Sequence, residues 1–435
     1  MPSFFWLWEN PSQFITITII IHDFPRNFNG GGVFLFGKVR LDSRTEREYN
    51  KYNQKKPPSG GIKKGGRLVE NRSIDERTSP RSCAGQDSAG RSSGVLPWLR
   101  GTAFFLILTM GLMFGVGCRR FAQKQRFVVT VVDLFDTVTE LIGYADSRAE
   151  FDAQWEPVYD TLHRLHRLYD AYSVYENVVN VATINQSVGQ EERHFRVEEE
   201  LFALLLFGKN AYAWTEGKVN AAMGCVTSLW KEAAETGVLP SETALASAAT
   251  HSSYDSIVLE ASERTVTIRD SQLKLDVGAI AKGFALRKAR ELLIRAGAFG
   301  YCLNLGGTVC AFGTKPDGNA FVMGIRGPSG DSYVRTLALT GQTVTTSGNA
   351  YRFFTVDGHR YSHLIDPFTC FPAATFYSVT VTSEDPAEGD VFSTALFCMS
   401  EAEGRALLAK HPMIRALWID ANGKITETEG FGDTK

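Results

Sequence analysis

An aspartate and a threonine four residues apart could bind a metal ion. Asp390 and Thr394 lie in the apolar stretch 389–397, which follows Asp385-Pro386. An aspartate before a proline suits a helix N-cap and first turn, so the stretch predicts a helix with carboxylate and hydroxyl on one face. Oxygen ligands of this kind suit Mg²⁺, which keeps several waters and needs few protein ligands. On its own, however, such a pair is usually structural.

Lys282 could bind an anion. It stands in the first turn of a helix predicted over 281–296, where free backbone N–H groups and the helix dipole already favour a phosphate. A lysine there adds a full positive charge, although an exposed lysine at a helix start is the commoner case. His363, in the sequence SHLIDP and within a predicted strand over 360–365, is a third polar residue of interest, but a lone histidine is usually structural.

The elements around Lys282 give it a defined place. The chain reads as a strand ending at Asp276, a turn at Gly278, the amphipathic helix, and a second strand over 301–305. Gly297 is a natural stop for the helix, and the second strand ends in Gly306-Gly307, where a ligand could approach the backbone closely. The layout is that of an anion site between two strands.

Four stretches together carry a family resemblance. Besides Ala281-Lys282-Gly283, the chain contains GQTVTTSGN at 341–349, RYSHLIDPFTCFPA at 360–373 and GDVFSTALF at 389–397. In this order they resemble the bacterial flavin transferase (ApbE) family, and weaker similarity runs from about Phe127 to Asp420. The resemblance implies an α+β fold with mixed sheets and outer helices, related to the tunnelling fold, and a nucleotide cleft between lobes.

The resemblance also implies roles for particular residues. Mg²⁺ would be held by Asp390, Thr394 and the backbone carbonyl of Ala279, and His363 would be the base that removes a hydroxyl proton, a task that suits the pKa range of histidine. The other expected FAD contacts are Tyr175, Asn185, Asp276, Lys282, Gly306, Gly307, Thr346, Ser347 and Gly348. From the residues alone, Tyr175 could equally be ordinary packing and Asn185 a helix cap. The sequence departs from the family at Cys370, where glycine is usual, and at Phe368, where arginine is common.

The activity implied by the family is transfer of FMN from FAD to a Ser or Thr of an extracytoplasmic acceptor protein, with release of AMP. The acceptor would belong to a membrane redox complex. Two alternatives stay open: hydrolysis of FAD to FMN and AMP, and a flavin-binding lipoprotein without catalysis. The chain has a net charge of −2, and its basic excess is confined to residues 1–95, so no nucleic-acid partner is expected.

The N-terminal region has a separate organisation. The chain is rich in Gly, Ser, Pro and Lys between Asn50 and Gly94, without a helical or strand period. Residues 1–95 are therefore predicted to be disordered, or to be an extension upstream of a true start near Val95. Residues 96–118 have the anatomy of a signal peptide and end in Gly-Val-Gly-Cys118, which resembles a lipoprotein cleavage site. Residues 119–435 would form the catalytic domain. The enzyme would then be lipid-anchored at the extracytoplasmic face of a bacterial cell membrane; an uncleaved membrane anchor is the alternative.

The remaining pattern predicts the scaffold. Two strands are expected within 127–144, a helix from 149 to about 172, a polar loop over 172–190, a helix over 197–215 and a hairpin over 414–428. A capping box at Ser400 and Glu403 should begin another helix. The chain has seven cysteines without CxxC spacing, which is neither a disulfide framework nor a zinc pattern.

Overall fold

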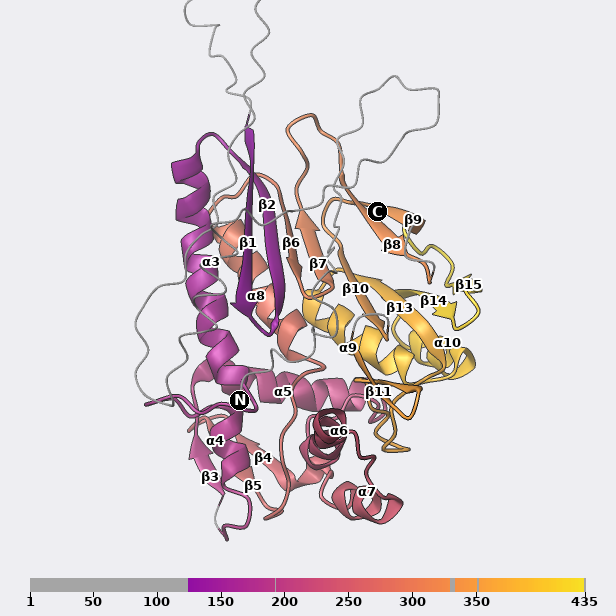
Figure 1. Ribbon diagram of the computed structural model, residues 1–435. Coiled ribbons are helices and arrows are strands. Elements are labelled where there is room, and N and C mark those ends of the chain that lie inside the picture. Colours follow the sequence, from indigo (N-terminus) through magenta and orange to yellow (C-terminus); the bar gives the residue numbers. More distant parts are fainter. Residues whose placement is uncertain (1–123, 192, 329–332, 350–351, 434–435) are drawn as a thin grey trace, which may run out of the picture.

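A large antiparallel sheet forms the centre of the molecule (Figure 1). The computed structural model describes residues 124–191, 193–328, 333–349 and 352–433. Every ladder within these residues is antiparallel, and the strand order of the large sheet is β1-β2-β6-β7-β10-β13-β14-β15. Its strands are β1 (Gln125–Leu134), β2 (Thr137–Ala145), β6 (Tyr301–Leu305), β7 (Thr308–Phe312), β10 (Thr343–Gly348), β13 (Phe376–Ser383), β14 (Arg415–Asp420) and β15 (Ile425–Glu427).

Three helices cover one face of this sheet and bury the main core. They are α3 (Arg148–Tyr169), α8 (Ala281–Arg295) and α9 (Pro386–Phe397), and α10 (Glu401–Ala409) follows α9 beside the sheet. Phe151, Phe284 and Phe392 are among the core side chains that these helices contribute. Since α9 is buried on nearly all sides, its polar residues Asp390, Ser393 and Thr394 lie inside the protein.

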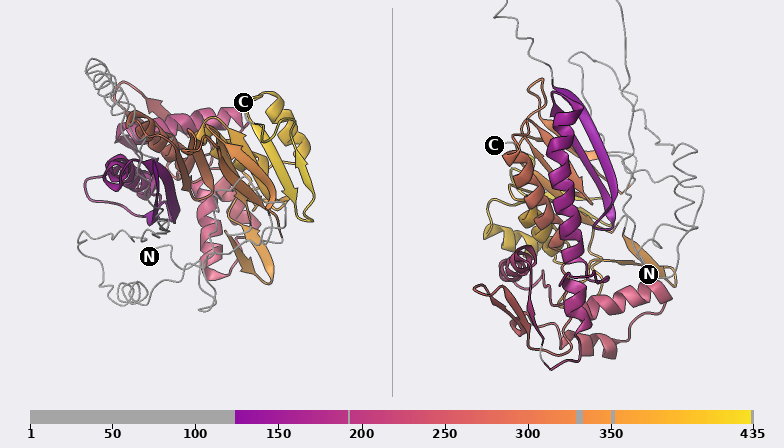
Figure 2. Two further views of the ribbon diagram at one scale, coloured as in Figure 1. Left: turned by 90° about the horizontal axis from the view of Figure 1, so that it is seen from above. Right: turned by 90° about the vertical axis from the view of Figure 1, so that its left-hand side faces the viewer.

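A hairpin covers the opposite face. The strands β8 (Phe321–Arg326) and β9 (Tyr333–Leu339) bring Phe321, Ile325 and Leu337 against Val344 and Leu417 of the large sheet. The middle of the sheet is therefore covered on both sides, and the side view in Figure 2 shows the helices on one side of it. This cover explains why β6 and β7 are buried on both faces, whereas much of β1 is exposed.

A smaller group of elements lies at one end of the large sheet, in the lower part of Figure 1. Its helices are α4 (Val181–Gln186), α5 (Glu199–Trp214), α6 (Gly224–Thr236) and α7 (Glu242–Ala249), with a 3₁₀ turn at Tyr254–Ser256. Its strands are β3 (His194–Arg196), β4 (Ile257–Glu260) and β5 (Thr265–Ile268), and the hairpin β11 (Phe353–Val356) and β12 (His359–Ser362) packs on α6. Trp230, Phe354 and Val356 form the apolar contact between α6 and that hairpin.

Most sequence predictions of local structure are confirmed. The α+β class, the first two strands, the helices now seen as α3, α5, α8 and α9, and the β14–β15 hairpin are present. Asp385 caps α9 through the N–H of Ala387 with Pro386 at the first helical position, and Ser400 and Glu403 form the expected capping box.

Three local predictions were wrong. Residues 273–277 are not a strand, because their backbone groups pair with loops and side chains: Lys274 accepts from the Gly224 N–H, and the Asp276 N–H donates to Ala221. The expected loop over 172–190 contains the short helix α4, whose start Asn180 caps with a complete capping box. The strand expected over 360–365 ends at Ser362, so His363 lies just beyond it.

The predictions for the N-terminal region and for the cysteines have different outcomes. The extension over 1–95 and the signal segment over 96–118 lie outside the described residues, as does Cys83. The described cysteines are all free thiols: Cys302, Cys310, Cys370 and Cys398 are buried, and Cys225 is partly so. Within the described ranges, no helix combines the length and apolarity needed to cross a membrane.

Candidate active site

The start of α8 meets the middle of α9 in an unusually close contact. The residue before the helix, Ile280, has no side chain that could cap the free N–H groups of the first turn. Asp390 of α9 does this instead, because its Oδ2 accepts a 2.8 Å hydrogen bond from the Gly283 N–H. Only glycine fits here, since a Cβ at position 283 would lie 2.5 Å from the Asp390 Cβ and from the Pro386 carbonyl. The glycine of the Ala-Lys-Gly motif thus joins the two helices.

This contact leaves a backbone carbonyl free. In a continuing helix the Gly283 N–H would donate to the carbonyl of Ala279, four residues earlier. Because it donates to Asp390, no described group donates to the Ala279 oxygen. Thr394, one turn after Asp390, is 9% exposed, and its hydroxyl also has no hydrogen-bond partner within the described part of the chain.

The oxygen atoms at this junction fit a hard cation. They comprise the Asp390 carboxylate, the Thr394 hydroxyl and the Ala279 carbonyl, and all three are oxygen ligands of the kind that Mg²⁺ takes. The buried hydroxyl of Thr308 at the start of β7 belongs to the same group, because its hydrogen bonding to Asp390 lowers the pKa of that carboxylate. The described residues contain no cluster of three or more His, Cys, Asp and Glu side chains, so any metal here would be held by one carboxylate and neutral oxygens.

Lys282 provides the positive charge nearest to this group. Its Nζ donates a 3.1 Å hydrogen bond to the carbonyl of Gly278, which directs the half-buried side chain back over the turn before α8. Burial raises the pKa of Asp390, while the charge of Lys282 and the Gly283 N–H oppose this shift. The carboxylate is therefore held in a buried position where a positive partner is favourable.

His363 is held as a neutral base. Its Nδ1 lies 2.9 Å from the carbonyl oxygen of Arg352. A carbonyl can only accept, so Nδ1 carries the hydrogen and Nε2 is the nitrogen left to take up a proton. Although the residue has an exposed surface, dense surrounding protein lowers its pKa to about 4, and the positive charges of Arg352 and Lys282 act in the same direction. The charge of Lys282 thus acts on His363 as well as on Asp390.

Strand β10 brings the TSG residues to the same junction. Ser347 Oγ lies 2.9 Å from Ser393 Oγ of α9, whereas Thr346 on the other face of the strand meets Thr380 of β13. The Thr346 N–H donates to Gly307, so the glycine turn between β6 and β7 lies beside this strand. Gly348 ends the strand opposite Ser378.

Both glycines of the β6–β7 turn have a positive φ, 59° for Gly306 and 97° for Gly307. A Cβ at Gly306 would meet the side chain of Thr137 at 2.8 Å, whereas one at Gly307 would meet only the Thr346 oxygen, at 3.6 Å. Gly306 is therefore needed for the packing of the turn against β2. Gly307 keeps one side of its backbone open.

Asp276 and Asn185 shape the turn that leads into α8. The Asp276 Oδ1 accepts from the Gly278 N–H at 2.8 Å. Asn185 of α4 pairs with the backbone of Leu275 in both directions, at 2.9 Å and 2.7 Å. Its amide thus both donates and accepts to hold the chain next to Asp276, and the helix cap in this region is Asn180. The Asn185 side chain thus supports the site by holding the backbone of Leu275.

Tyr175 is engaged locally, apart from the other predicted residues. Its hydroxyl donates to Asp170 at 2.8 Å, and the guanidinium of Arg167 lies 4.7 Å from its ring centre. Tyr172, in the same loop, faces the site more directly, because the negative charge of Asp276 is the largest cause that raises its pKa. The ring of Tyr172 also lies 3.3 Å from the Nζ of Lys231 on α6.

A cavity of about 140 Å³ lies between the ends of β10 and β12. It lies between Asn349, which follows Gly348, and Ser362, which precedes His363. Drug-sized ligands usually occupy cavities of roughly 300–1,000 Å³. This cavity therefore has room for only part of a dinucleotide or for one side chain of a polypeptide. Its walls also include Phe353, Tyr361, Phe371 and Pro372.

Sequence reasoning missed Arg352 and Thr308. Arg352 supplies the carbonyl that orients His363 and a positive charge that lowers the pKa of His363; its own guanidinium donates to the Asp136 carbonyl at 3.2 Å. Its place four residues after Gly348, between two predicted site motifs, was a usable signal. Thr308 follows Gly306-Gly307 directly, so its position was also visible.

Known proteins resemble this chain in sequence and in fold. The ApbE family model matches residues 135–418. A FAD:protein FMN transferase of Treponema pallidum is 32% identical over 256 residues, covering 54% of this chain and 70% of the relative. A protein of the same name from Klebsiella pneumoniae is 28% identical and covers 56% and 76% of the two chains.

Solved structures show the same fold. The crystal structure of the ApbE protein of Thermotoga maritima aligns with a TM-score of 0.64 at 26% identity, covering 72% of this chain and 100% of the other. The flavin transferase ApbE of Vibrio cholerae aligns with a TM-score of 0.62 at 21% identity, covering 70% and 97%. The match of sequence and fold extends over all the elements that meet at the α8–α9 junction, and the chain belongs to the ApbE family.

Proposed function

We propose that the protein is a Mg²⁺-dependent FAD:protein FMN transferase, which moves FMN from FAD to a Ser or Thr of an acceptor protein and releases AMP. Its relatives carry the name of this transfer activity. The observation that supports a metal-dependent reaction here is the hydrogen bond from Gly283 to Asp390, which leaves the Ala279 carbonyl and the Thr394 hydroxyl free beside a buried carboxylate. Simple flavin binding does not require such an oxygen group next to a lysine.

The proposed reaction is a phosphoryl transfer. The oxygen of the acceptor hydroxyl attacks the phosphorus on the FMN side of the FAD pyrophosphate. The bond from that phosphorus to the bridging oxygen breaks, and AMP leaves with that oxygen. Bound at Asp390, Thr394 and Ala279, Mg²⁺ would neutralise negative charge on the pyrophosphate.

The chain's own residues would supply the remaining steps. Lys282 lies at a helix N-terminus, where it would bind the phosphates and stabilise the leaving AMP. The Nε2 of His363 would take the proton of the acceptor hydroxyl, since its Nδ1 is engaged with Arg352. Gly307, Thr346 and Ser347 would form the backbone wall along which the nucleotide lies.

The location of the enzyme belongs to the same proposal. We place the protein at the extracytoplasmic face of a bacterial membrane, anchored through a lipid on Cys118, so that it meets an acceptor in a membrane redox complex. Mass spectrometry of the native N-terminus tests this part. A mature chain beginning at a lipidated Cys118 is expected, and recovery of peptides from residues 1–90 would contradict it.

One incubation tests the activity. The purified protein is mixed with FAD, Mg²⁺ and a protein that carries a flavinylation site, and the products are followed as protein-bound flavin fluorescence in a gel and as free AMP. Transfer predicts both signals, each lost when EDTA removes the metal. AMP without labelled protein would indicate hydrolysis of FAD, and neither signal would indicate a binding protein.

A further inference from the structure

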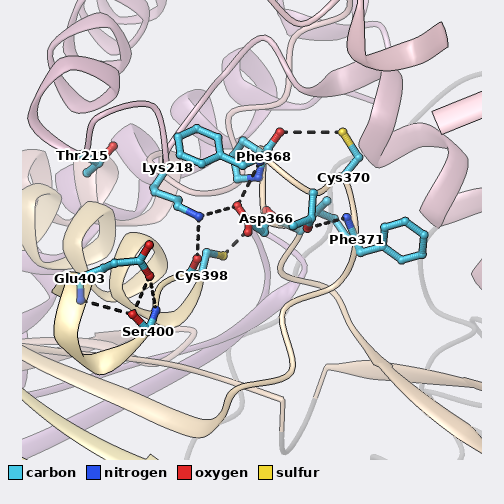
Figure 3. A network of polar contacts seen from close by, with 12 residues as sticks. Thr215, Lys218, Asp366, Phe368, Cys370, Phe371, Cys398, Ser400 and Glu403 are labelled. Atoms are coloured by element: carbon cyan, nitrogen blue, oxygen red, sulfur yellow. Dashed lines mark hydrogen bonds and ion pairs between the residues drawn. The ribbon is translucent and has the colours of Figure 1, made fainter. Parts of the chain in front are cut away.

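A buried lysine outside the proposed catalytic group connects three parts of the site. Lys218 lies just after α5, and its side chain is only 9% exposed. Its Nζ is 2.9 Å from Asp366 Oδ1, 3.0 Å from the Cys398 carbonyl oxygen and 4.3 Å from the centre of the Phe368 ring (Figure 3). Two oxygen atoms thus take two of the three N–H donors of the ammonium group, and the Phe368 ring lies against the same charge.

The turn that carries Lys218 is itself fixed. Thr215 is fully buried, and its hydroxyl donates to Ala211 while it accepts from the Val219 N–H. Glu216 and Gly217 both have a positive φ, so the chain reverses sharply after α5. The backbone of Lys218 is therefore held on a rigid corner.

The partner carboxylate organises the turn after His363. Asp366 Oδ1 accepts from the Phe368 N–H at 3.1 Å, and its backbone exchanges hydrogen bonds with Cys370 and Phe371. The Asp366 side chain is 15% exposed. Lys218 thus binds the one carboxylate that closes the turn three residues beyond His363.

The third contact reaches α9. Cys398 is the C-terminal cap of this helix, so its carbonyl lies at the negative end of the helix dipole. The same helix carries Thr394 about one turn earlier and Asp390 about two turns earlier. Lys218 therefore ties the turn after His363 to the helix that holds the oxygen group.

We infer that Lys218 is a positioning residue, which through Asp366 and the end of α9 fixes the proposed base His363 relative to Asp390 and Thr394. The inference rests on the proposed function, since it assigns the ion pair to that site. The loss of Lys218 should therefore slow the chemical step while leaving FAD binding largely unchanged.

The test compares single variants with a charge-balanced double variant. Lys218→Met leaves a buried carboxylate unpaired, which threatens folding by itself. Lys218→Met combined with Asp366→Asn removes both charges and keeps an oxygen that can accept from the Phe368 N–H. The matched control is Lys410→Met, because Lys410 forms an ion pair with Glu216 on the same corner but both side chains are more than half exposed.

The expected result is a separation of kcat from FAD affinity. The double variant should lose at least about tenfold in single-turnover FMN transfer and keep its FAD affinity within about threefold. Its melting temperature should stay close to that of the wild type, and Lys410→Met should be unchanged in every measurement. Parallel losses of melting temperature, FAD affinity and rate would reduce Lys218 to a structural role and overturn the inference, as would an unchanged rate.

Hydrogen exchange separates this inference from the proposed function. In the double variant the amides of Phe368 and Cys370 should exchange faster, while those of β13 keep their protection. Unaltered exchange over 363–372 would refute the positioning role whatever the activity. A wild-type protein that binds FAD but neither transfers FMN nor releases AMP would instead refute the proposed function.

Discussion

Replacing Gly283 by alanine should separate α8 from α9 at the proposed metal site. The new Cβ would lie 2.5 Å from the Asp390 Cβ and the Pro386 carbonyl, against an ordinary contact of at least 3.4 Å. The helices must therefore move apart by about 0.9 Å, which stretches or breaks the 2.8 Å bond from the Gly283 N–H to Asp390. No flexible side chain can absorb this movement, since the clashing atoms are a backbone oxygen and a Cβ.

Two costs and one gain determine the change in the free energy of unfolding. Overpacking costs about 1–3 kcal/mol, and loss of a hydrogen bond to a charged group costs about 1.5–3 kcal/mol. Alanine regains about 0.8–1 kcal/mol over glycine within a helix. The expected loss in the free energy of unfolding is therefore about 2–5 kcal/mol, or a fall in Tm of roughly 3–8 °C for a domain of about 300 residues.

The same substitution should impair metal use. A displacement near 1 Å at a catalytic group can cost about 10²-fold in rate, so the half-saturating Mg²⁺ concentration should rise and the maximal transfer rate should fall. Thermal melting without metal and a Mg²⁺ titration of FMN transfer measure the two effects. Gly341→Ala is the control, because nothing lies within 4 Å of its Cβ position. Wild-type melting and Mg²⁺ dependence in Gly283→Ala would refute the reasoning; a lower Tm with unchanged Mg²⁺ dependence would refute the link to the metal.

Three further substitutions test the proposed roles. Asp390→Asn keeps an acceptor for the Gly283 N–H but removes the charge, so Mg²⁺-dependent turnover should be lost with little change in Tm. Because burial raises the pKa of Asp390, the Mg²⁺ affinity of the wild-type protein should weaken as the pH falls. Lys282→Ala should weaken FAD binding and slow turnover, and an unchanged FAD affinity would mark Lys282 as a surface residue. His363→Ala should lose about 10²–10⁴-fold in transfer rate while it still binds FAD and Mg²⁺, and a rate within about threefold of the wild type would exclude the base role. Since the pKa of His363 is lowered to about 4, its neutral form persists well below the ordinary pKa of about 6.5. Wild-type kcat/KM should therefore fall only as the pH drops toward about 4, the pKa of His363. A fall in kcat/KM already near pH 6.5 would contradict this.

The elements that carry the site could be predicted because their signals are local. Asp385-Pro386 marks the start of α9, Gly297 with φ 70° follows the end of α8, and the apolar run 301–305 is a strand. Each of these depends on residues a few positions apart. The prediction of a strand over 273–277 failed for the opposite reason. The alternating leucines of this segment are buried as in a strand, but its hydrogen-bond partners come from parts of the chain that are distant in sequence.

The site itself could be predicted only in part. Family motifs indicated Asp390, Thr394 and Lys282, but no local pattern shows that the Gly283 N–H turns away from Ala279 to a residue 107 positions later. The partners of Asn185 and the carbonyl that orients His363 are likewise set by tertiary contacts, and the pairing of Lys218 with Asp366 spans 148 positions. Residue type at a motif position therefore predicts which chemical groups are present, whereas the fold decides which of their oxygen and nitrogen atoms remain free to bind a ligand.

The departure at Cys370 shows how such contacts can replace a glycine. Cys370 has a φ of 60°, a conformation that costs a non-glycine residue about 1–2 kcal/mol. Its N–H donates to Asp366 at 2.8 Å, and its carbonyl accepts from Trp230 Nε1 at 2.7 Å. Two buried hydrogen bonds at about 0.5–1.5 kcal/mol each are enough to offset this strain. The turn after His363 thus keeps the left-handed geometry that a glycine would adopt, held by main-chain hydrogen bonds that do not depend on the side chain at position 370.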